Sequence, residues 1–99
     1  MFGKVRITDL TYKEVSTGLS LLGFIHKRTT ASHEQWIGYR DGRKYVVTVD
    51  KPQSPFHIKL IESMAQQSGI HKKQFYLLCK GKIEVDKHLH LCVVGEPVT

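Results

Sequence analysis

The sequence predicts an α+β fold: a three-stranded antiparallel sheet covered on one face by helices. Helical spacing of apolar residues occurs on both sides of three consecutive extended runs. An Asp-Gly dipeptide, a strong hairpin signal, joins the last two runs. The 99 residues are enough for one hydrophobic core and too few for two. We expect the order α-β-β-β-α-α, with the second face of the sheet left for solvent or a partner.

The first predicted helix runs from Tyr12 to Leu22. Thr11 and Glu14 have the spacing of a capping box, in which two side chains and two backbone amides bond reciprocally. Apolar side chains follow at helical spacing, at Val15, Leu19 and Leu22. Gly23 is placed to end the helix in the left-handed conformation. Gly18, in the interior, costs about 1 kcal/mol of helix propensity.

Three extended runs follow, rich in β-branched and aromatic residues. They are Phe24 to Thr29, Gln35 to Tyr39 and Lys44 to Val49. Asp41-Gly42 supplies a tight turn between the second and third runs. The runs therefore predict a meander of antiparallel strands.

A second helix is expected after the prolines that break the chain. Ser54 has the chemistry of an N-cap, and Pro55 suits the first helical position. Gly69 is placed to end this helix, and a short third helical segment begins near Lys72. The apolar stripe of the second helix comprises Ile58, Ile61, Met64 and Ala65.

The composition favours an anionic partner and a location in the cytoplasm. Lys and Arg number 15 against 9 Asp and Glu, which gives a formal net charge of +6 and suits nucleic acid. No apolar run approaches the roughly 18 residues of a membrane span, and charges interrupt the N-terminal segment where a signal peptide is apolar. We therefore expect no membrane association. Cys79 and Cys92 form no C-x-x-C pair, so we expect their thiols to be reduced.

Common catalytic and metal-binding motifs do not occur. The sequence contains no phosphate-binding glycine loop, no serine nucleophile elbow and no His-Glu-x-x-His zinc motif. His88, His90 and Cys92 alternate along one extended segment, a spacing that rarely closes a tetrahedral metal site. We therefore expect no metal site and no cofactor.

His33 is the strongest of the 6 histidines as a candidate for acid–base chemistry. It lies in a small polar turn between two predicted strands, where a side chain can face the open side of the sheet. Arg28 precedes it, and further cations surround the next hairpin, at Arg40, Arg43 and Lys44. Proton transfer beside guanidinium groups is what phosphodiester chemistry requires. The alternative is a solvated basic face with an incidental histidine.

We expect subsidiary roles for two further residues, Ser32 and His26. Ser32 is adjacent to His33 in the chain and is expected to support the turn or a hydrogen bond rather than to act as a nucleophile. His26 lies two residues before Arg28 and is predicted on the same strand face, as a second proton-transfer group or a surface residue.

A resemblance to a known protein family rests on several short segments, taken together with their order and spacing along the chain. They are Leu10 to Val15, Leu22 to Phe24, Arg28, Ala31 to His33, Asp41 to Arg43 and Gln67 to Ile70. In these segments the chain resembles the HicA-type toxins of bacterial toxin–antitoxin modules. The resemblance covers about Leu10 to Cys79 and implies a domain of residues 1–82 with a fold like that of double-stranded-RNA-binding domains. Ala31 stands where the family usually has glycine.

The resemblance implies a metal-independent endoribonuclease, an mRNA interferase, in which His33 is the catalytic acid or base. The RNA-binding residues would be Arg28, Ser32, Arg40, Arg43 and Lys44. It also implies a HicB-type antitoxin that covers the His33 face and carries any contact with DNA, in the bacterial cytoplasm. Two other interpretations stay open: a non-catalytic RNA-binding module of the same fold, and a protein-interaction domain.

Residues 83–99 extend past the usual end of the family. Apolar residues alternate with polar ones there, at Ile83, Val85, Leu89, Leu91 and Val93. This pattern predicts a strand or hairpin over residues 83–94 that packs on the domain or on a partner. A mobile terminus is the alternative.

Overall fold

The computed structural model describes residues 5–84, and its elements follow the predicted order. They are α1 (Tyr12–Leu22), β1 (Ile25–Thr30), β2 (His33–Arg40), β3 (Arg43–Asp50), the 3-10 turn η1 (Lys51–Gln53), α2 (Ile58–Ser68) and α3 (Lys72–Cys79). None of the helices within residues 5–84 has the length and apolar character needed to cross a membrane. Apart from Ile83 and Glu84, which form no strand, the predicted C-terminal strand or hairpin lies outside the described residues.

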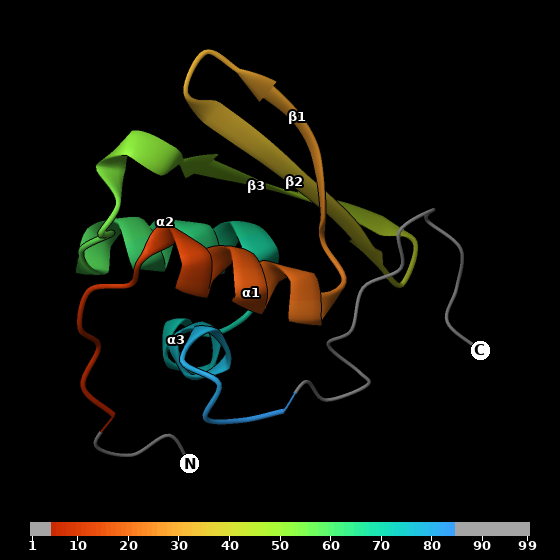
Figure 1. The fold of residues 1–99 in the computed structure, drawn as a ribbon. Coiled ribbons are helices and arrows are strands. Elements are labelled where there is room, and N and C mark those ends of the chain that lie inside the picture. Colours follow the sequence, from red (N-terminus) through yellow and green to blue (C-terminus); the bar gives the residue numbers. More distant parts are fainter. Residues whose placement is uncertain (1–4, 85–99) are drawn as a thin grey trace.

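The three strands form one antiparallel sheet in the order β1-β2-β3. Figure 1 shows α1 and α2 on one side of the sheet, with α3 beneath these two helices. On β2, the buried positions Glu34, Trp36 and Gly38 point to the helices. Alternate residues of a strand point to opposite faces. The other side is called the open face here, and its residues on β2 are His33, Gln35, Ile37 and Tyr39.

The turn between β2 and β3 sets the pairing of these two strands. Asp41 and Gly42 both have positive φ, 52° and 76°, as the tight two-residue hairpin turn of type I′ requires. The pairing then runs without a break from Arg40 opposite Arg43 to His33 opposite Asp50. β2 therefore begins two residues earlier than predicted, at His33.

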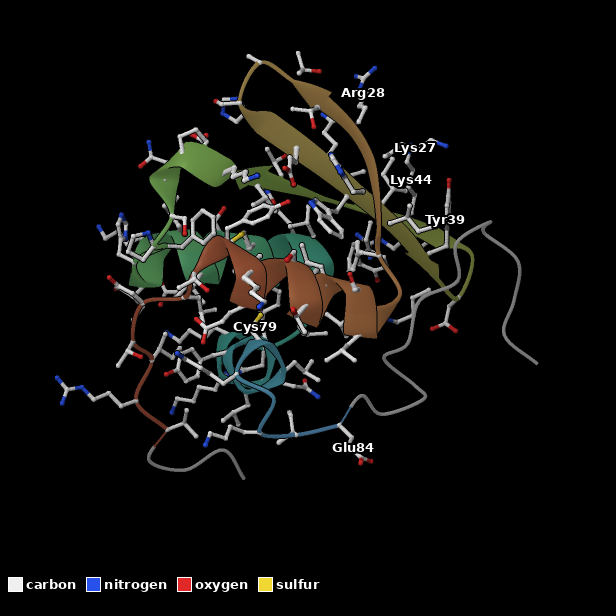
Figure 2. All side chains as sticks on the ribbon, in the orientation of Figure 1. Lys27, Arg28, Tyr39, Lys44, Cys79 and Glu84 are labelled. Carbon is white, nitrogen blue, oxygen red and sulfur yellow. The ribbon has the colours of Figure 1, made fainter. Side chains whose placement is uncertain are left out.

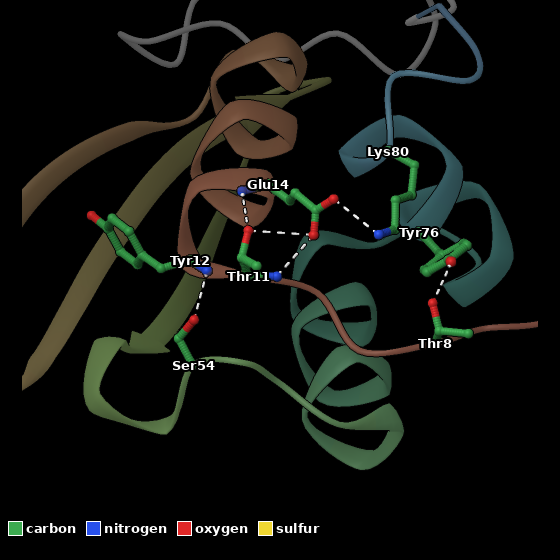
Figure 3. A network of polar contacts seen from close by, with 7 residues as sticks. All are labelled: Thr8, Thr11, Tyr12, Glu14, Ser54, Tyr76 and Lys80. Carbon is green, nitrogen blue, oxygen red and sulfur yellow. Dashed lines mark hydrogen bonds and ion pairs between the residues drawn. The ribbon is translucent and has the colours of Figure 1, made fainter.

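The predicted start of the second helix is wrong. α2 begins at Ile58 with His57 as its N-cap, because the preceding residues are used elsewhere. Phe56 is 1% exposed, and its backbone N–H donates to the Leu10 carbonyl at 2.7 Å, while the Leu10 N–H donates to the Phe56 carbonyl at 3.0 Å. This bridge holds Phe56 in an extended conformation. The Ser54 hydroxyl accepts the Tyr12 backbone N–H at 2.8 Å and so helps begin α1 instead of α2 (Figure 3).

The apolar stripe of α2 is correspondingly shorter than predicted. Ile58 stands at the first helical position and is 45% exposed, so its assignment to the stripe is wrong. Ile61, Met64 and Ala65 are buried, as predicted. The predicted ends of two helices are confirmed: Gly23 and Gly69 follow α1 and α2 with φ of 98° and 79°.

Gly18 lies where α1 and α3 approach most closely. A Cβ atom added to Gly18 would lie 2.5 Å from the Cys79 Sγ atom and 3.1 Å from the Cys79 Cα atom. The second of these atoms belongs to the backbone and cannot rotate away. The glycine that weakens α1 as an isolated helix is therefore what lets α3 pack against it.

We predict that Gly18→Ala destabilises the protein. The substitution gains about 1 kcal/mol of helix propensity, but overpacking a close contact costs about 1 to 3 kcal/mol. Because the added Cβ meets backbone that cannot yield, we expect the upper part of that cost, so the free energy of unfolding in urea should fall by up to about 2 kcal/mol. Ser20→Ala, at an exposed position of the same helix, is the matched control and should leave stability unchanged or slightly higher. A Gly18→Ala variant as stable as the control would contradict the packing argument.

Glu14 joins the start of α1 to the end of α3 (Figure 3). Its carboxylate accepts the Thr11 backbone N–H at 2.9 Å, and its own N–H donates to the Thr11 hydroxyl at 3.2 Å, which confirms the capping box. The Lys80 ammonium lies 2.9 Å from the other carboxylate oxygen. The Thr11 amide, aided by Lys80, holds the pKa of Glu14 below its usual value.

We predict that Glu14 contributes to acid sensitivity. A carboxyl group whose pKa is lowered by folding stabilises the protein above its unfolded pKa of about 4.3, and this contribution is lost as the pH falls through the folded value. Glu14→Gln should lower the free energy of unfolding by about 1 kcal/mol at pH 7 and by less at pH 3. Glu62→Gln is the control, because the ion pair of Glu62 with Lys72 joins two half-exposed side chains. Equal losses at both pH values would contradict the assignment.

Candidate active site

His33 and Asp50 form a pair on the open face of the sheet. They stand opposite each other because His33 begins β2 and Asp50 ends β3. The His33 Nε2 atom lies 3.6 Å from the Asp50 Oδ2 atom, and the two side chains are 55% and 28% exposed. The distance is longer than that of a hydrogen bond. The carboxylate is nevertheless the acidic group beside the imidazole, and it lies on the side from which a carboxylate can orient a histidine ring.

A pocket of about 250 Å³ opens beside this pair, between β3 and α2. The sheet contributes His33, Thr48 and Asp50 to its lining. The other wall and the floor consist of Phe56, Leu60, Ser63, Met64 and Gln67. The Gln67 side-chain carbonyl accepts the Thr48 backbone N–H at 3.0 Å and so fixes the end of α2 to the edge of β3.

The turn before His33 contains the alanine that departs from the HicA pattern. Ala31 and Ser32 form this turn between β1 and β2, and Ala31 has a φ of 55°. A left-handed alanine costs about 1 to 2 kcal/mol that a glycine would not. Ser32 is a turn residue, as predicted. The turn is thus made with alanine at a cost in stability, and His33 follows it directly.

Arg28 is the predicted cation that lies nearest to His33 in the sheet. It pairs with Gln35, and its Nε–H donates to the Gln35 side-chain carbonyl at 3.3 Å. Gln35 is two residues from His33 on the same face, about 7 Å along the strand. Arg28 and His33 therefore stand on the same face of the sheet, at paired positions two residues apart.

The prediction that His26 shares a strand face with Arg28 is wrong. A β-bulge between these residues shifts the pairing, so that His26 stands opposite Trp36 and Arg28 opposite Gln35. An extra residue in one strand reverses the alternation that follows it. The His26 ring stacks on Trp36 with centroids 5.4 Å apart, and its Nε2 atom lies 2.9 Å from the Thr29 hydroxyl. His26 therefore stands on the opposite side of the sheet from His33.

The remaining predicted cations lie at the far end of the sheet. Arg40 is the last residue of the eight-residue β2, about 23 Å from His33 along the strand. Its Nη2 group donates to the Ser68 carbonyl at 3.1 Å, and its guanidinium lies 4.7 Å from the centre of the Tyr45 ring. Arg43 lies 5.4 Å from the same ring centre. The structure therefore brings Arg28 and Ser32 to His33 but not Arg40, Arg43 or Lys44.

Lys44 belongs instead to a second group of side chains on the open face. Figure 2 shows Lys27, Arg28, Tyr39 and Lys44 projecting from the same side of the sheet, away from the helices. A shallow hollow of about 150 Å³ is lined there by Lys27, Tyr39, Lys44 and two isoleucines. Cations and an aromatic ring on one face are a combination that suits single-stranded nucleic acid.

A buried polar network lies directly behind His33. Glu34 is 6% exposed, and its carboxylate accepts the Tyr12 hydroxyl at 2.7 Å and the Trp36 indole N–H at 3.1 Å. Burial, followed by the contact with Glu34, raises the pKa of Tyr12 to about 12. The network ties α1 to β2, and because neighbouring strand residues point to opposite faces, it keeps His33 on the open face.

We did not identify Asp50 or Glu34 as site residues from the sequence, although the sequence contains a pattern that points to each. Counting seven residues outward from Arg40 and Arg43, on either side of the predicted Asp-Gly turn, brings His33 opposite Asp50. Glu34 shares its strand face with Trp36, where a charged residue requires buried partners. Neither signal names the partner atoms, which depend on α1 and α2.

The other chemistry-bearing side chains of residues 5–84 have structural roles. His57 and His71 cap α2 and α3 by accepting backbone N–H groups at 3.2 and 3.1 Å. Burial raises the pKa of the Cys79 thiol to about 12, so this thiol is protonated and unreactive at neutral pH. Within residues 5–84 no cluster of three His, Cys, Asp or Glu side chains could hold a metal ion, and the His88, His90 and Cys92 set lies outside these residues.

Comparison of the chain with models of protein families, with curated proteins and with solved structures finds no match. The site combines an imidazole, a carboxylate beside it, a guanidinium on the same face and a pocket next to them. Proton transfer to or from an anionic substrate is the chemistry that these groups can perform together.

Proposed function

We propose that the protein is a metal-independent endoribonuclease of the HicA type, the toxin of a toxin–antitoxin pair, in which His33 transfers the proton. The observation that carries this proposal is the His33–Asp50 pair at the rim of a pocket on the open face. The order α-β-β-β-α within residues 5–84 agrees with a fold like that of double-stranded-RNA-binding domains, which the resemblance to HicA-type toxins implies. The substrate is mRNA.

The proposed reaction uses the ribose 2′-hydroxyl as the nucleophile. His33 accepts the hydroxyl proton while the 2′-oxygen bonds to phosphorus, or returns a proton to the 5′-oxygen as its bond to phosphorus breaks. Asp50 holds the imidazole in position and stabilises its positive form during the transfer. DNA lacks the 2′-hydroxyl and is not cut.

Arg28 is the cation that stabilises the charge developing on the phosphate. It lies on the same face as His33, and its hydrogen bond to Gln35 restrains the guanidinium. Arg40, Arg43 and Lys44 lie too far from His33 to contact the reacting phosphate, about 20 Å along the strands. In this proposal they contact phosphates of the flanking RNA.

The open face is also the surface for the proposed antitoxin. It exposes Ile25 and Val46, which are 47% and 36% exposed, together with the cations around them. A HicB-type antitoxin with a complementary acidic surface would cover this face, His33 included, and would carry any contact with DNA. Toxin and antitoxin would meet in the bacterial cytoplasm.

We predict that purified protein cuts RNA in the presence of EDTA and that His33→Ala reduces the rate at least about 100-fold. Asp50→Asn should reduce it less, because Asp50 acts through His33. His26→Ala, on the other side of the sheet, is the matched control and should cut normally. The free energy of unfolding of His33→Ala should differ from that of the wild type by no more than about 0.5 kcal/mol, since the side chain is exposed. In bacteria, the wild type without a partner should arrest growth, and His33→Ala should not.

Each other outcome assigns a different function. Equal cutting by the wild type and His33→Ala would remove His33 from the catalytic role. RNA that is retarded in a gel but stays intact would indicate a non-catalytic RNA-binding module. RNA that is neither cut nor retarded would indicate a protein-interaction domain.

We predict that Arg28, Arg40, Arg43 and Lys44 bind RNA phosphates rather than bases. Replacing one of them with alanine should flatten the slope of log affinity against log salt by about 0.7 for single-stranded RNA. Arg40→Ala needs a stability measurement beside it, because Arg40 also holds the end of α2. Unchanged slopes for all four variants would place the RNA elsewhere, with Lys59, Lys72 and Lys73 as the next residues to test.

A further inference from the structure

We infer that the pocket between β3 and α2 binds one unpaired nucleobase of the RNA, next to the phosphate that the 2′-hydroxyl attacks with His33 as the proton-transfer group. This inference rests on the proposed function and adds the kind of substrate: a single strand whose base leaves the stack and enters the protein. It also adds a consequence, a preference for one base beside the cut. The pocket volume is about 250 Å³. Pockets for drug-sized ligands occupy roughly 300 to 1,000 Å³, so a single base suits this one better than a dinucleotide.

The lining has the chemistry of a base-binding site. Leu60, which is partly buried, supplies apolar surface that suits the face of a flat heterocycle, and the buried side chains of Phe56 and Met64 lie behind it in the lining. Thr48, Ser63 and Gln67 supply polar groups for its edge. The side-chain carbonyl of Gln67 already accepts the Thr48 N–H, which fixes the orientation of this amide and leaves its NH₂ group as the donor.

Asp50 determines which part of a nucleotide enters. Its Oδ1 atom is buried and has no hydrogen-bond donor among residues 5–84. Such an acceptor costs about 1 to 3 kcal/mol until a donor reaches it. A base edge offers N–H groups, which a rotated carboxylate can accept, whereas a phosphate would be repelled. The base therefore enters the pocket and the phosphate stays outside, on the side of His33 and Arg28.

The position of His33 connects the pocket with the reaction. The imidazole lines the pocket and is also half-exposed on the open face. A base held in the pocket therefore brings its own ribose and 2′-hydroxyl next to His33. Holding the 2′-hydroxyl, the nucleophile, beside His33, the group that accepts its proton, removes much of the entropic cost of the reaction.

A nucleobase fits the pocket better than an apolar side chain of a protein partner. An apolar anchor would cover Thr48, Ser63 and Gln67 without bonding to them, at a cost for each buried polar group. The carboxylate of Asp50 would meet an apolar surface as well. A base satisfies the polar rim and the apolar floor together.

Three substitutions at exposed positions of α2 test the pocket. Ser63→Phe fills it, and Gln66→Phe adds the same side chain at an exposed neighbouring position outside the lining. Gln67→Glu keeps the carbonyl that accepts the Thr48 N–H but replaces the NH₂ donor with an acceptor. The first measurement titrates the four ribonucleoside 3′-monophosphates while recording the Met64 methyl resonance. The second maps cleavage sites on RNA of random sequence.

We expect the nucleotides to shift the Met64 resonance in the wild type and in Gln66→Phe, but not in Ser63→Phe. Wild-type cleavage should favour one base at one position beside the cut by about 5- to 150-fold, the range that a paired base contact provides. Gln67→Glu should change the favoured base at that position, and Ser63→Phe should abolish the preference. Gln66→Phe should match the wild type.

The two measurements separate this inference from the proposed function. Cleavage whose base preference survives both Ser63→Phe and Gln67→Glu would overturn the pocket and keep the nuclease. Shifts at Met64 without any cleavage would keep the pocket and overturn the nuclease. A Met64 resonance that responds to leucinamide but to no nucleotide would assign the pocket to a protein partner and overturn the inference.

Discussion

The pairing of β2 with β3 is the constraint on which the rest of the site depends. Asp41 and Gly42 adopt positive φ, and this turn fixes the register of the two strands. A slip of one residue would turn His33 to the helix side and move Asp50 away from it, since side chains alternate along a strand. The same slip would expose Glu34 and Trp36, which are buried. The hydrophobic core and the candidate site therefore require the same register.

The helices are held to this sheet by a few polar contacts at their ends. Gln67 binds the edge of β3, Arg40 binds the last turn of α2, and Glu34 binds Tyr12 at the start of α1. The contacts of Arg40 and Glu34 are partly buried, so they also satisfy polar groups that would otherwise lose their partners in water. The contact of Gln67 has a second effect, because it places α2 beside His33 and creates the wall of the pocket.

The chemistry of the site follows from the positions of opposite charges. Asp50 lies beside His33 within the pocket lining, while Arg28 lies on the open face outside it. Under the proposed function, a nucleotide would meet a carboxylate where its uncharged base is to enter and a guanidinium where its phosphate is to lie. The distant cations at Arg43 and Lys44 belong to a longer surface rather than to the reacting centre.

The sequence by itself determined the order of the elements, the capping box of α1 and the Asp-Gly turn, because each depends on residues close together in the chain. It also singled out His33 as a candidate, whose role stays a prediction. The tertiary structure alone decided which distant residues of the chain contact each other. The bridge of Phe56 with Leu10 moved the start of α2, and the β-bulge after His26 separated that residue from Arg28. Gly18, unfavourable in an isolated helix, is explained by Cys79 on α3. These outcomes depend on contacts between distant segments, where packing and buried hydrogen bonds override local propensity.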